Sequence, residues 1–221
     1  MIDNILTLGD IRRDRTVQAW IAASDAALGV MNYTEHGTPH AERTAETAAG
    51  LLKTLGYPER DCELARIAGF LHDIGNGINR VSHAISGALL AAEILNRLGM
   101  PPEETAAVAA AIGNHDEQAA AAVTPVTAAV ILADKSDVRR SRVREKDQEE
   151  FDIHDRVNYA AVAAELTVRE EILSLAIQID TEICAVMDYF EIFLGRMQLC
   201  RCAAEFLGKK FELVINETRM L

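Results

Sequence analysis

The stretch AGFLHDIGN, residues 68–76, decides the fold, because an apolar helical run ends there in the polar doublet His72-Asp73. The apolar residues before the doublet recur at every third or fourth position, which is the spacing of one buried helix face. We therefore expect a helix over residues 58–75 that starts at a proline and ends near a glycine. The doublet falls at the C-terminus of this helix, whose partial negative charge favours a cation.

Helical spacing continues on both sides of this stretch. Thr-Pro pairs at 38–39 and 124–125 are typical helix starts, and single glycines follow several of the apolar runs, as they do at helix ends. Besides residues 58–75, the sequence predicts helices over 11–29, 38–55, 82–99, from 101 onward and 124–144. We therefore expect a mainly α-helical chain.

The pattern changes after the sixth of these helices. Residues 145–158 are polar and charged and are expected to form a connector. Residues 181–207 return to helical spacing, and residues 169–171 are the expected turn of a hairpin. Apolar residues that alternate with a period of two predict strands over 166–168, 173–179 and 211–215.

These elements divide the chain into two expected parts. One is a helical domain over 1–146, and the other is a small α+β subdomain, β-β-α-β in order, over 147–221. A chain of 221 residues has room for one domain and a small second one, with a core that needs no disulfide. The four cysteines form no CxxC pair, so we expect free and mostly buried thiols.

The net charge excludes one class of partner. The chain has 34 acidic and 22 basic side chains, a net charge of −12, whereas binding to a nucleic-acid polymer needs Lys and Arg to displace counterions. No run reaches the ~20 apolar residues of a membrane-spanning helix, and the first residues lack the regions of a secretory signal. We expect a cytoplasmic protein that acts on a small molecule, not on a nucleic-acid polymer or a membrane.

Six side chains that can bind a metal lie in the helical part. Four successive predicted helices carry one histidine each, and the doublet adds an aspartate. A second aspartate follows the apolar run 128–133 and should face the core, where an unpaired carboxylate is too costly. Imidazole with carboxylate suits iron, zinc, manganese or cobalt better than calcium. The candidate ligands are His40, His72, Asp73, His83, His115 and Asp134.

The order of these residues resembles the HD superfamily of metal-dependent phosphohydrolases, whose signature is a histidine, a His-Asp doublet and a distal aspartate. The matching segments are HAERTAETA, AGFLHDIGN, SHAISGALLAAEIL, AIGNHDE and VILADKSD, within about residues 35–140. The resemblance implies an HD-type helical bundle. It also implies that a metal-activated water hydrolyses a phosphoester or phosphoanhydride bond, in a nucleotide or a small phosphorylated metabolite.

The resemblance further implies the layout of a metal centre. The signature residues would hold one ion, and His83 and His115 match the additional histidines of the branch that holds two. In that branch the aspartate of the doublet, here Asp73, bridges both ions, so we place it at the centre of catalysis. The implied cofactor is one or two divalent transition-metal ions, first iron or manganese and then zinc, cobalt or nickel.

Basic residues gather next to the distal aspartate. Residues 135–146 hold six basic and two acidic side chains. On the helix expected over 124–144, Lys135 and Arg142 lie within about 100° of Asp134 and can reach a phosphate beside the metal. Arg144 and Lys146 fit a solvated face or a salt bridge better. The predicted substrate contacts are Lys135, Arg142, Arg43, Arg80 and Asn76.

Some family features are missing. Many members have a lysine three residues after the doublet, where this chain has Asn76, and Lys135 or Arg80 is expected to replace its charge. The Gly-Tyr-Pro motif of the cyclic-dinucleotide branch is absent, and so is the acidic pair of the ppGpp-hydrolysing branch. The spacing and the LADKSD segment are most similar to the branch that cleaves dinucleoside polyphosphates.

Three glycines and two further histidines remain to be placed. Gly69, Gly87 and Gly113 lie within about one turn of proposed ligands, which fits close backbone approach as well as chance placement. His36 is expected in a loop near the mouth of the site, and His154 in the connector.

Two other functions fit the same sequence. Some HD proteins bind a mixed-valence iron pair with this ligand set and activate oxygen, so a di-iron oxygenase is one alternative. A nucleotide sensor without catalysis, whose C-terminal part transmits a signal, is the other. The apolar residues of the C-terminal part fit either a core or a homodimer interface.

Overall fold

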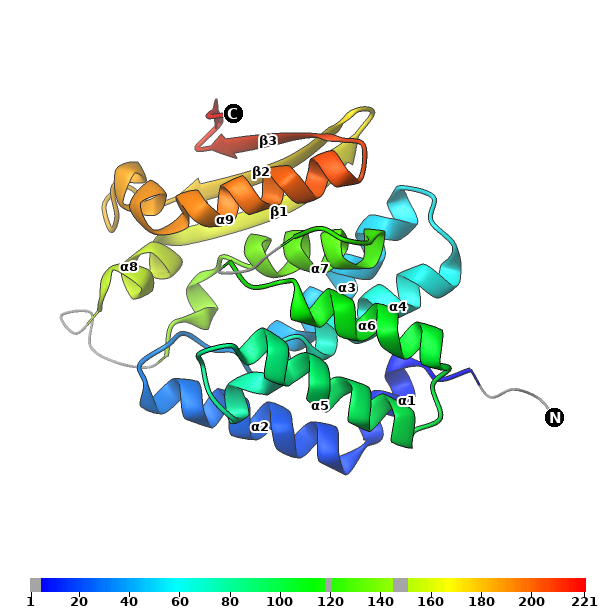
Figure 1. Ribbon diagram of the computed structural model, residues 1–221. Coiled ribbons are helices and arrows are strands. Elements are labelled where there is room, and N and C mark those ends of the chain that lie inside the picture. Colours follow the sequence, from blue (N-terminus) through cyan, green and yellow to red (C-terminus); the bar gives the residue numbers. More distant parts are fainter. Residues whose placement is uncertain (1–4, 118–120, 145–150) are drawn as a thin grey trace.

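The apolar patterns fold into the helices and the small sheet drawn in Figure 1. The computed structural model describes residues 5–117, 121–144 and 151–221. The α-helices are α1 Leu8–Arg13, α2 Arg15–Val30, α3 Thr38–Thr54, α4 Glu59–Leu71, α5 His83–Arg97, α6 Pro102–Gly113, α7 Pro125–Ser136, α8 Ile153–Ala160 and α9 Val186–Phe206. Two short 3-10 helices are η1 Ile74–Gly77 and η2 Arg140–Arg142. The strands are β1 Ala161–Arg169, β2 Ile172–Ile179, β3 Lys210–Ile215 and β4 Thr218–Arg219.

Helix α7 is the centre of the helical part. Its residues from Val126 to Ala133 are all buried, because it packs against α3, α4, α6 and α9 at once. A helix that is apolar on all sides belongs inside a bundle. Around it, α3 pairs with α4 and α5 pairs with α6. The C-terminal end of α7, which carries Asp134, therefore points into the middle of the molecule.

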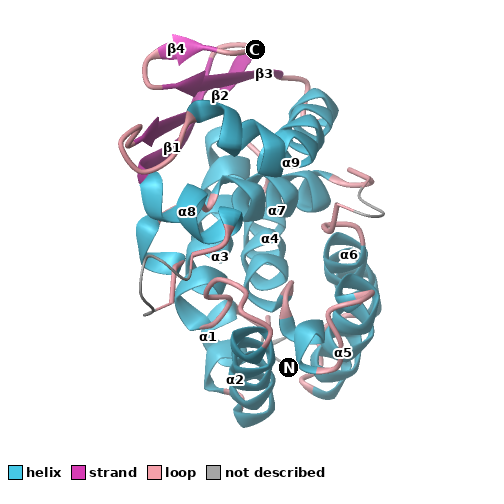
Figure 2. Ribbon diagram, turned by 90° about the vertical axis from the view of Figure 1, so that its left-hand side faces the viewer, coloured by secondary structure: helices cyan, strands magenta, loops and turns pink. Residues whose placement is uncertain are grey.

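The sheet lies at one end of the molecule, with α9 packed alongside it (Figures 1 and 2). Its strand order is β1-β2-β3-β4, with β2 and β3 parallel and the other two pairs antiparallel. Helix α9 connects the parallel strands β2 and β3, as parallel pairing requires. Because Leu173, Leu175 and Ile177 pair with Phe211, Leu213 and Ile215, their buried side chains form one apolar face.

The expected fold class is confirmed: the described residues form a mainly helical bundle with a small C-terminal α+β part. The hairpin turn also lies where it was predicted, at Glu170 and Glu171. The order β-β-α-β gains only the two-residue strand β4. The division at 146/147 stays a prediction, and α9 packs against α7 across it. None of the described helices combines the length and the apolar character needed to cross a bilayer.

One helix is much shorter than predicted. The helix expected over 124–144 ends at Ser136, because the backbone of Asp137 leaves the helical region with φ −79° and ψ 72°. The carboxylate of Asp137 accepts a local hydrogen bond from Arg139 and a long-range one from His40, so a tertiary contact holds Asp137 where the helix ends. Arg142 consequently lies in η2 and not on the helix of Asp134.

Five other predicted boundaries are wrong. The strand expected over 166–168 begins earlier, at Ala161, as β1. The helix expected over 11–29 is interrupted at Asp14, whose side chain caps α2. The helix expected over 58–75 ends at Leu71, so that the His-Asp doublet follows it. The expected connector contains α8, which begins with a capping box at Asp152, while residues 145–150 lie outside the described residues. The helix expected from 181 starts at Val186.

Candidate metal centre

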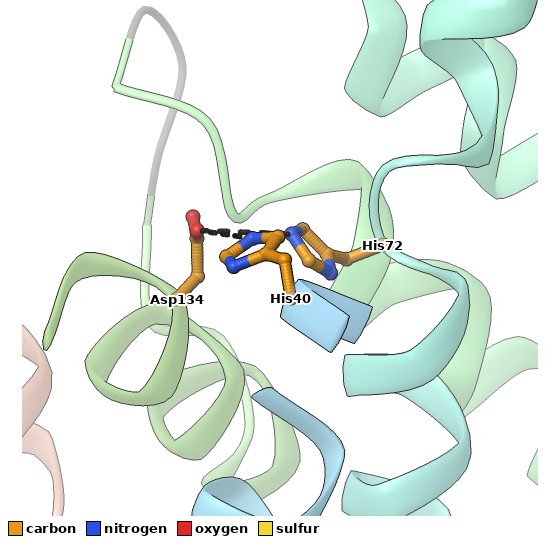
Figure 3. Close-up of side chains that lie close together, drawn as sticks. All are labelled: His40, His72 and Asp134. Atoms are coloured by element: carbon orange, nitrogen blue, oxygen red, sulfur yellow. Dashed lines mark hydrogen bonds and ion pairs between the residues drawn. The ribbon is translucent and has the colours of Figure 1, made fainter. Parts of the chain in front are cut away.

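The structure brings the six candidate ligands together at one point. His40 comes from α3, His83 begins α5, and Asp134 is near the end of α7. The doublet follows α4, and His115 follows α6. All four imidazoles are buried. In Figure 3 the side chains of His40, His72 and Asp134 converge from separate elements.

One group of donor atoms surrounds the Nε2 atoms of His40 and His72. These two atoms are 3.2 Å apart, and Oδ1 of Asp134 lies 3.3 Å from the first of them. Oδ2 of Asp73 lies 3.2 Å from Nε2 of His72. Four donors around a tetrahedral ion with bonds of about 2.1 Å are about 3.4 Å apart. These residues could therefore hold one ion.

A second group uses the other oxygen of the same aspartate. Oδ1 of Asp73 lies 3.4 Å from Nε2 of His83 and 3.9 Å from Nε2 of His115. The two imidazole nitrogens are 3.3 Å apart. The carboxylate of Asp73 thus faces both groups, one oxygen toward each.

Each imidazole has its other nitrogen occupied. Nδ1 of His72 donates to the carbonyl of Gly69 at 2.7 Å, and Nδ1 of His115 donates to that of Ile112 at 2.6 Å. Nδ1 of His83 faces the carbonyl of Arg80 in the same way, at 3.1 Å. A carbonyl can only accept, so these Nδ1 atoms carry the hydrogen. In the neutral rings, Nε2 therefore has no hydrogen, and its lone pair points at the other candidate ligand atoms, as in metal-binding histidines.

The electrostatics of the cluster favour a cation. Burial opposes protonation of His72, but the carboxylates of Asp73 and Asp134 outweigh it and raise its pKa to about 10. Burial, with the charges of His72 and Lys135, lowers the pKa of His115 to about 3. Burial alone would raise the pKa values of both carboxyl groups, yet His72 beside Asp73 and Lys135 beside Asp134 hold them well below their usual range. A divalent cation would supply the positive charge that a protonated His72 otherwise supplies.

Two residues outside the ligand set form hydrogen bonds to ligand side chains and orient them. Oδ2 of Asp137 accepts from Nδ1 of His40 at 2.7 Å, and Asp137 is buried. Asn76 donates through Nδ2 to Oδ1 of Asp73 at 2.9 Å. The sequence reasoning expected Asn76 at the substrate, and the structure places its amide on the bridging carboxylate. The sequence analysis did not identify Asp137; the only signal for it was that the LADKSD segment contains a second aspartate.

The predicted basic contacts lie at different depths. Nζ of Lys135 is 2.8 Å from Oδ2 of Asp134. Nη1 of Arg80 is 3.3 Å from the His83 ring. The side chain of Arg43 is half exposed and pairs with Asp137 at 3.0 Å, on the far side of the ligands.

Close backbone packing holds the elements of the centre together. A Cβ added to Gly69 would lie 3.0 Å from backbone atoms of Ala45, and one added to Gly87 would lie 3.2 Å from the backbone nitrogen of Gly75. One added to Gly113 would meet only ordinary contact, at 3.6 Å from the side chain of Ala88. Close approach therefore explains the first two glycines and not the third.

A cleft of about 440 Å³ leads to the cluster. His36, Arg80, Asp116, Arg142 and Arg196 line both this cleft and a small cavity at the ligands themselves. His36 thus lies where it was expected, and its ring centroid is 5.4 Å from that of His40.

The remaining sequence predictions concern residues outside the ligand cluster. His154 lies on α8 and lines the cleft, so the prediction that it is a connector residue is wrong. Arg144 pairs with Asp25 at 2.7 Å, as the salt-bridge interpretation predicted. Lys146 lies outside the described residues. The four cysteines are free, and three of them are buried.

Comparisons with known proteins agree with this arrangement. A family model described as HD domain matches residues 39–191. An uncharacterized protein of Methanocaldococcus jannaschii is 28% identical over 105 residues, an alignment that covers 40% of each chain. The chain thus spans well under half the length of that curated relative.

Proposed function

The chain belongs to the HD domain family, and from that premise we propose that it is a phosphohydrolase with a centre for two divalent metal ions. The family consists generally of metal-dependent hydrolases. The proposed reaction is hydrolysis of a phosphoester or phosphoanhydride bond in a small phosphorylated molecule. The proposed ligands are the six side chains of the cluster, with Asp73 as the bridge.

One observation carries this proposal. The two carboxylate oxygens of Asp73 face two separate groups of imidazole nitrogens, at 3.2 Å from His72 and 3.4 Å from His83. A buried carboxylate needs positive charge nearby, which a protonated His72 supplies without metal and which bound ions would supply once His72 loses its proton. Two ions that share a carboxylate meet this need better than one.

The donor set also indicates the class of metal. Nitrogen and carboxylate oxygen without thiolate suit iron, manganese, zinc, cobalt or nickel, and we propose iron or manganese first. Two such ions, when bound, supply a water of lowered pKa and neutralise charge on a phosphoryl group.

The chain's own residues provide positioning and charge. Asp73 holds the two groups of ligands in register, and Asn76 fixes the orientation of its carboxylate. Asp137 orients the His40 ring. Lys135 and Arg80 extend positive charge from the ligands into the cavity, where they can hold phosphoryl oxygens in line for attack.

Two ligand variants test the proposal. Asp73→Ala and His72→Ala should each lose bound metal and phosphohydrolase activity while keeping most of the helical circular dichroism. His154→Ala, a histidine on α8 outside the ligand cluster, is the matched control and should keep its metal. The measurements are elemental analysis of the purified proteins and phosphate release from a panel of nucleotides and phosphoesters.

The outcomes separate the proposal from its alternatives. Full metal content in both ligand variants would refute the site. Activity with redox-inert metal supports hydrolysis, whereas substrate-dependent oxygen consumption by a coloured iron centre would replace it with the oxygenase. Tight nucleotide binding without turnover, over several metals, would instead favour a sensor.

A further inference from the structure

Arg196 joins the candidate centre from the C-terminal part of the chain. It lies on α9, beyond the residues that the family model matches, and lines both the cleft and the cavity at the ligands. Its Nε donates to Oε1 of Glu117 at 2.8 Å, and its guanidinium lies 4.4 Å from the ring centroid of Phe193. These contacts hold a cationic fork at the inner end of the cleft.

Arg142 lies next to the same cavity with one donor free. The side chain is buried; its Nε donates to the carbonyl of Glu35 and its Nη1 to that of Asp137, both at 3.0 Å. Its Nη2 is enclosed and has no hydrogen-bond partner among the described residues. A buried guanidinium N–H without an acceptor is costly, and an anionic oxygen is the acceptor that suits it best.

The two guanidinium groups act on each other. Burial lowers the pKa of Arg142, and the charge of Arg196 adds to that lowering, although Asp137 opposes it. Two like charges that line one cavity are stabilised when an anion binds between them.

The surroundings add positive charge. Lys135 and Arg80 line the same small cavity. Of its carboxylates, Asp73 and Asp134 are proposed metal ligands, which leaves Asp116. At the neighbouring wall, Glu117 is already paired with Arg196. Once divalent ions are bound, this cavity holds more positive charge than one phosphoryl group neutralises.

The order of groups along the cleft gives the shape of the ligand. The arginines lie at the end that adjoins the metal ligands, and Tyr33, Met31 and Asn158 lie further out in the cleft. A ligand whose phosphoryl group lies at the metals would thus pass the arginines next, and its organic group would contact the apolar and polar side chains further out.

We propose that Arg142 and Arg196 bind a second, non-reacting phosphoryl group, so that the substrate is a diphosphate ester and not a simple monoester. This inference rests on the proposed phosphohydrolase function. In the reaction, the oxygen of water forms a bond to the terminal phosphorus, and the bond from that phosphorus to the bridging oxygen breaks. The bridging oxygen stays on the organic monophosphate, orthophosphate leaves, and one proton passes to solvent. The arginines stabilise the charge that grows on the leaving phosphate.

A paired-substrate experiment tests this subsite. The metal-loaded protein is given an organic diphosphate and the monophosphate of the same alcohol, and kcat/KM is measured for both. Wild type should prefer the diphosphate, and Arg196→Gln should lower that preference about 10- to 100-fold, the usual effect of a lost charged hydrogen bond. Arg196→Lys should restore part of it. Arg201→Gln, an exposed arginine on the same helix, is the control and should keep the wild-type ratio.

A binding measurement separates this inference from the function on which it rests. Methylenediphosphonate, which cannot be hydrolysed at its P–C–P bridge, should bind the metal-loaded wild type more tightly than methylphosphonate, and Arg196→Gln should remove the difference in calorimetry. If neither ester is hydrolysed but this difference holds, the subsite stands and the hydrolase function falls. If both esters are hydrolysed with the same kcat/KM, and Arg196→Gln changes neither the ratio of these two values nor the difference in phosphonate affinity, the subsite is refuted and the function stands.

Discussion

Replacing Gly75 by alanine tests the packing that joins the two halves of the candidate centre. Gly75 lies in η1, two residues after Asp73, and its backbone meets the start of α5, which carries His83. A Cβ at position 75 would lie 2.0 Å from the carbonyl oxygen of His83 and 2.5 Å from the backbone nitrogen of Gly87. Cβ atoms essentially never approach other atoms within 3.0 Å. The two backbones must therefore separate by about 1 Å.

This separation should lower the free energy of unfolding and remove one bound metal ion. Overpacking costs ~1–3 kcal/mol, and we expect the upper end here because both obstacles are backbone atoms that no rotamer change can move. Nε2 of His83 is 3.4 Å from Oδ1 of Asp73. Metal–ligand distances tolerate only about 0.2 Å of error, so a shift of this size should remove the ion held by His83.

Urea denaturation and elemental analysis after dialysis measure these two effects. Gly50→Ala is the matched control, because a Cβ there meets nothing within 4 Å on helix α3. It should raise the free energy of unfolding by about 0.5–1 kcal/mol and leave the metal content unchanged. A Gly75→Ala protein with the wild-type midpoint and two ions per chain would refute this reasoning.

Three other predictions concern the ligands and the thiols. Asp137→Asn should weaken metal binding about 10- to 100-fold, because it loosens His40; competition with a chromogenic chelator measures this, and an unchanged affinity would contradict the orienting role. Metal binding should release a proton from His72, whose pKa of about 10 keeps it protonated without metal, so the affinity should rise from about pH 6 to 9. Calorimetry in buffers of different ionisation enthalpy checks this, and a pH-independent affinity would count against it. Cys202 is exposed, whereas Cys200 is buried with its pKa raised by burial to about 12; Ellman's reagent should modify one thiol quickly, and four equal rates would disprove this.

The sequence predicted those elements whose signals are local. The Thr124-Pro125 start, the glycine after α5 and the alternation over 173–179 depend on neighbouring residues, and the structure has each of them. The order of histidines and aspartates along the helices likewise indicated residues that converge. Local spacing was enough because the ligands lie on or directly after five successive helices, α3 to α7, whose packing brings them to a common point.

The sequence did not predict what tertiary contacts decide. The segment after Ser136 has no glycine or proline, so nothing in it predicts that α7 ends there. The end depends on Asp137, which is held by His40 from a helix almost a hundred residues earlier. Arg142 was predicted to contact the substrate because it was placed on the helix of Asp134, whereas it lies in η2. Arg196 was missed because α9 reaches the cavity only through the packing of the C-terminal part on α7.

The most direct test is a crystal structure of the protein grown with Mn²⁺ and measured at the manganese absorption edge. We predict two anomalous peaks about 3.5–4 Å apart, one on each side of the Asp73 carboxylate. The first should lie among His40, His72 and Asp134, and the second between His83 and His115. Anomalous peaks elsewhere in the molecule, with none at these side chains, would contradict the two-metal centre.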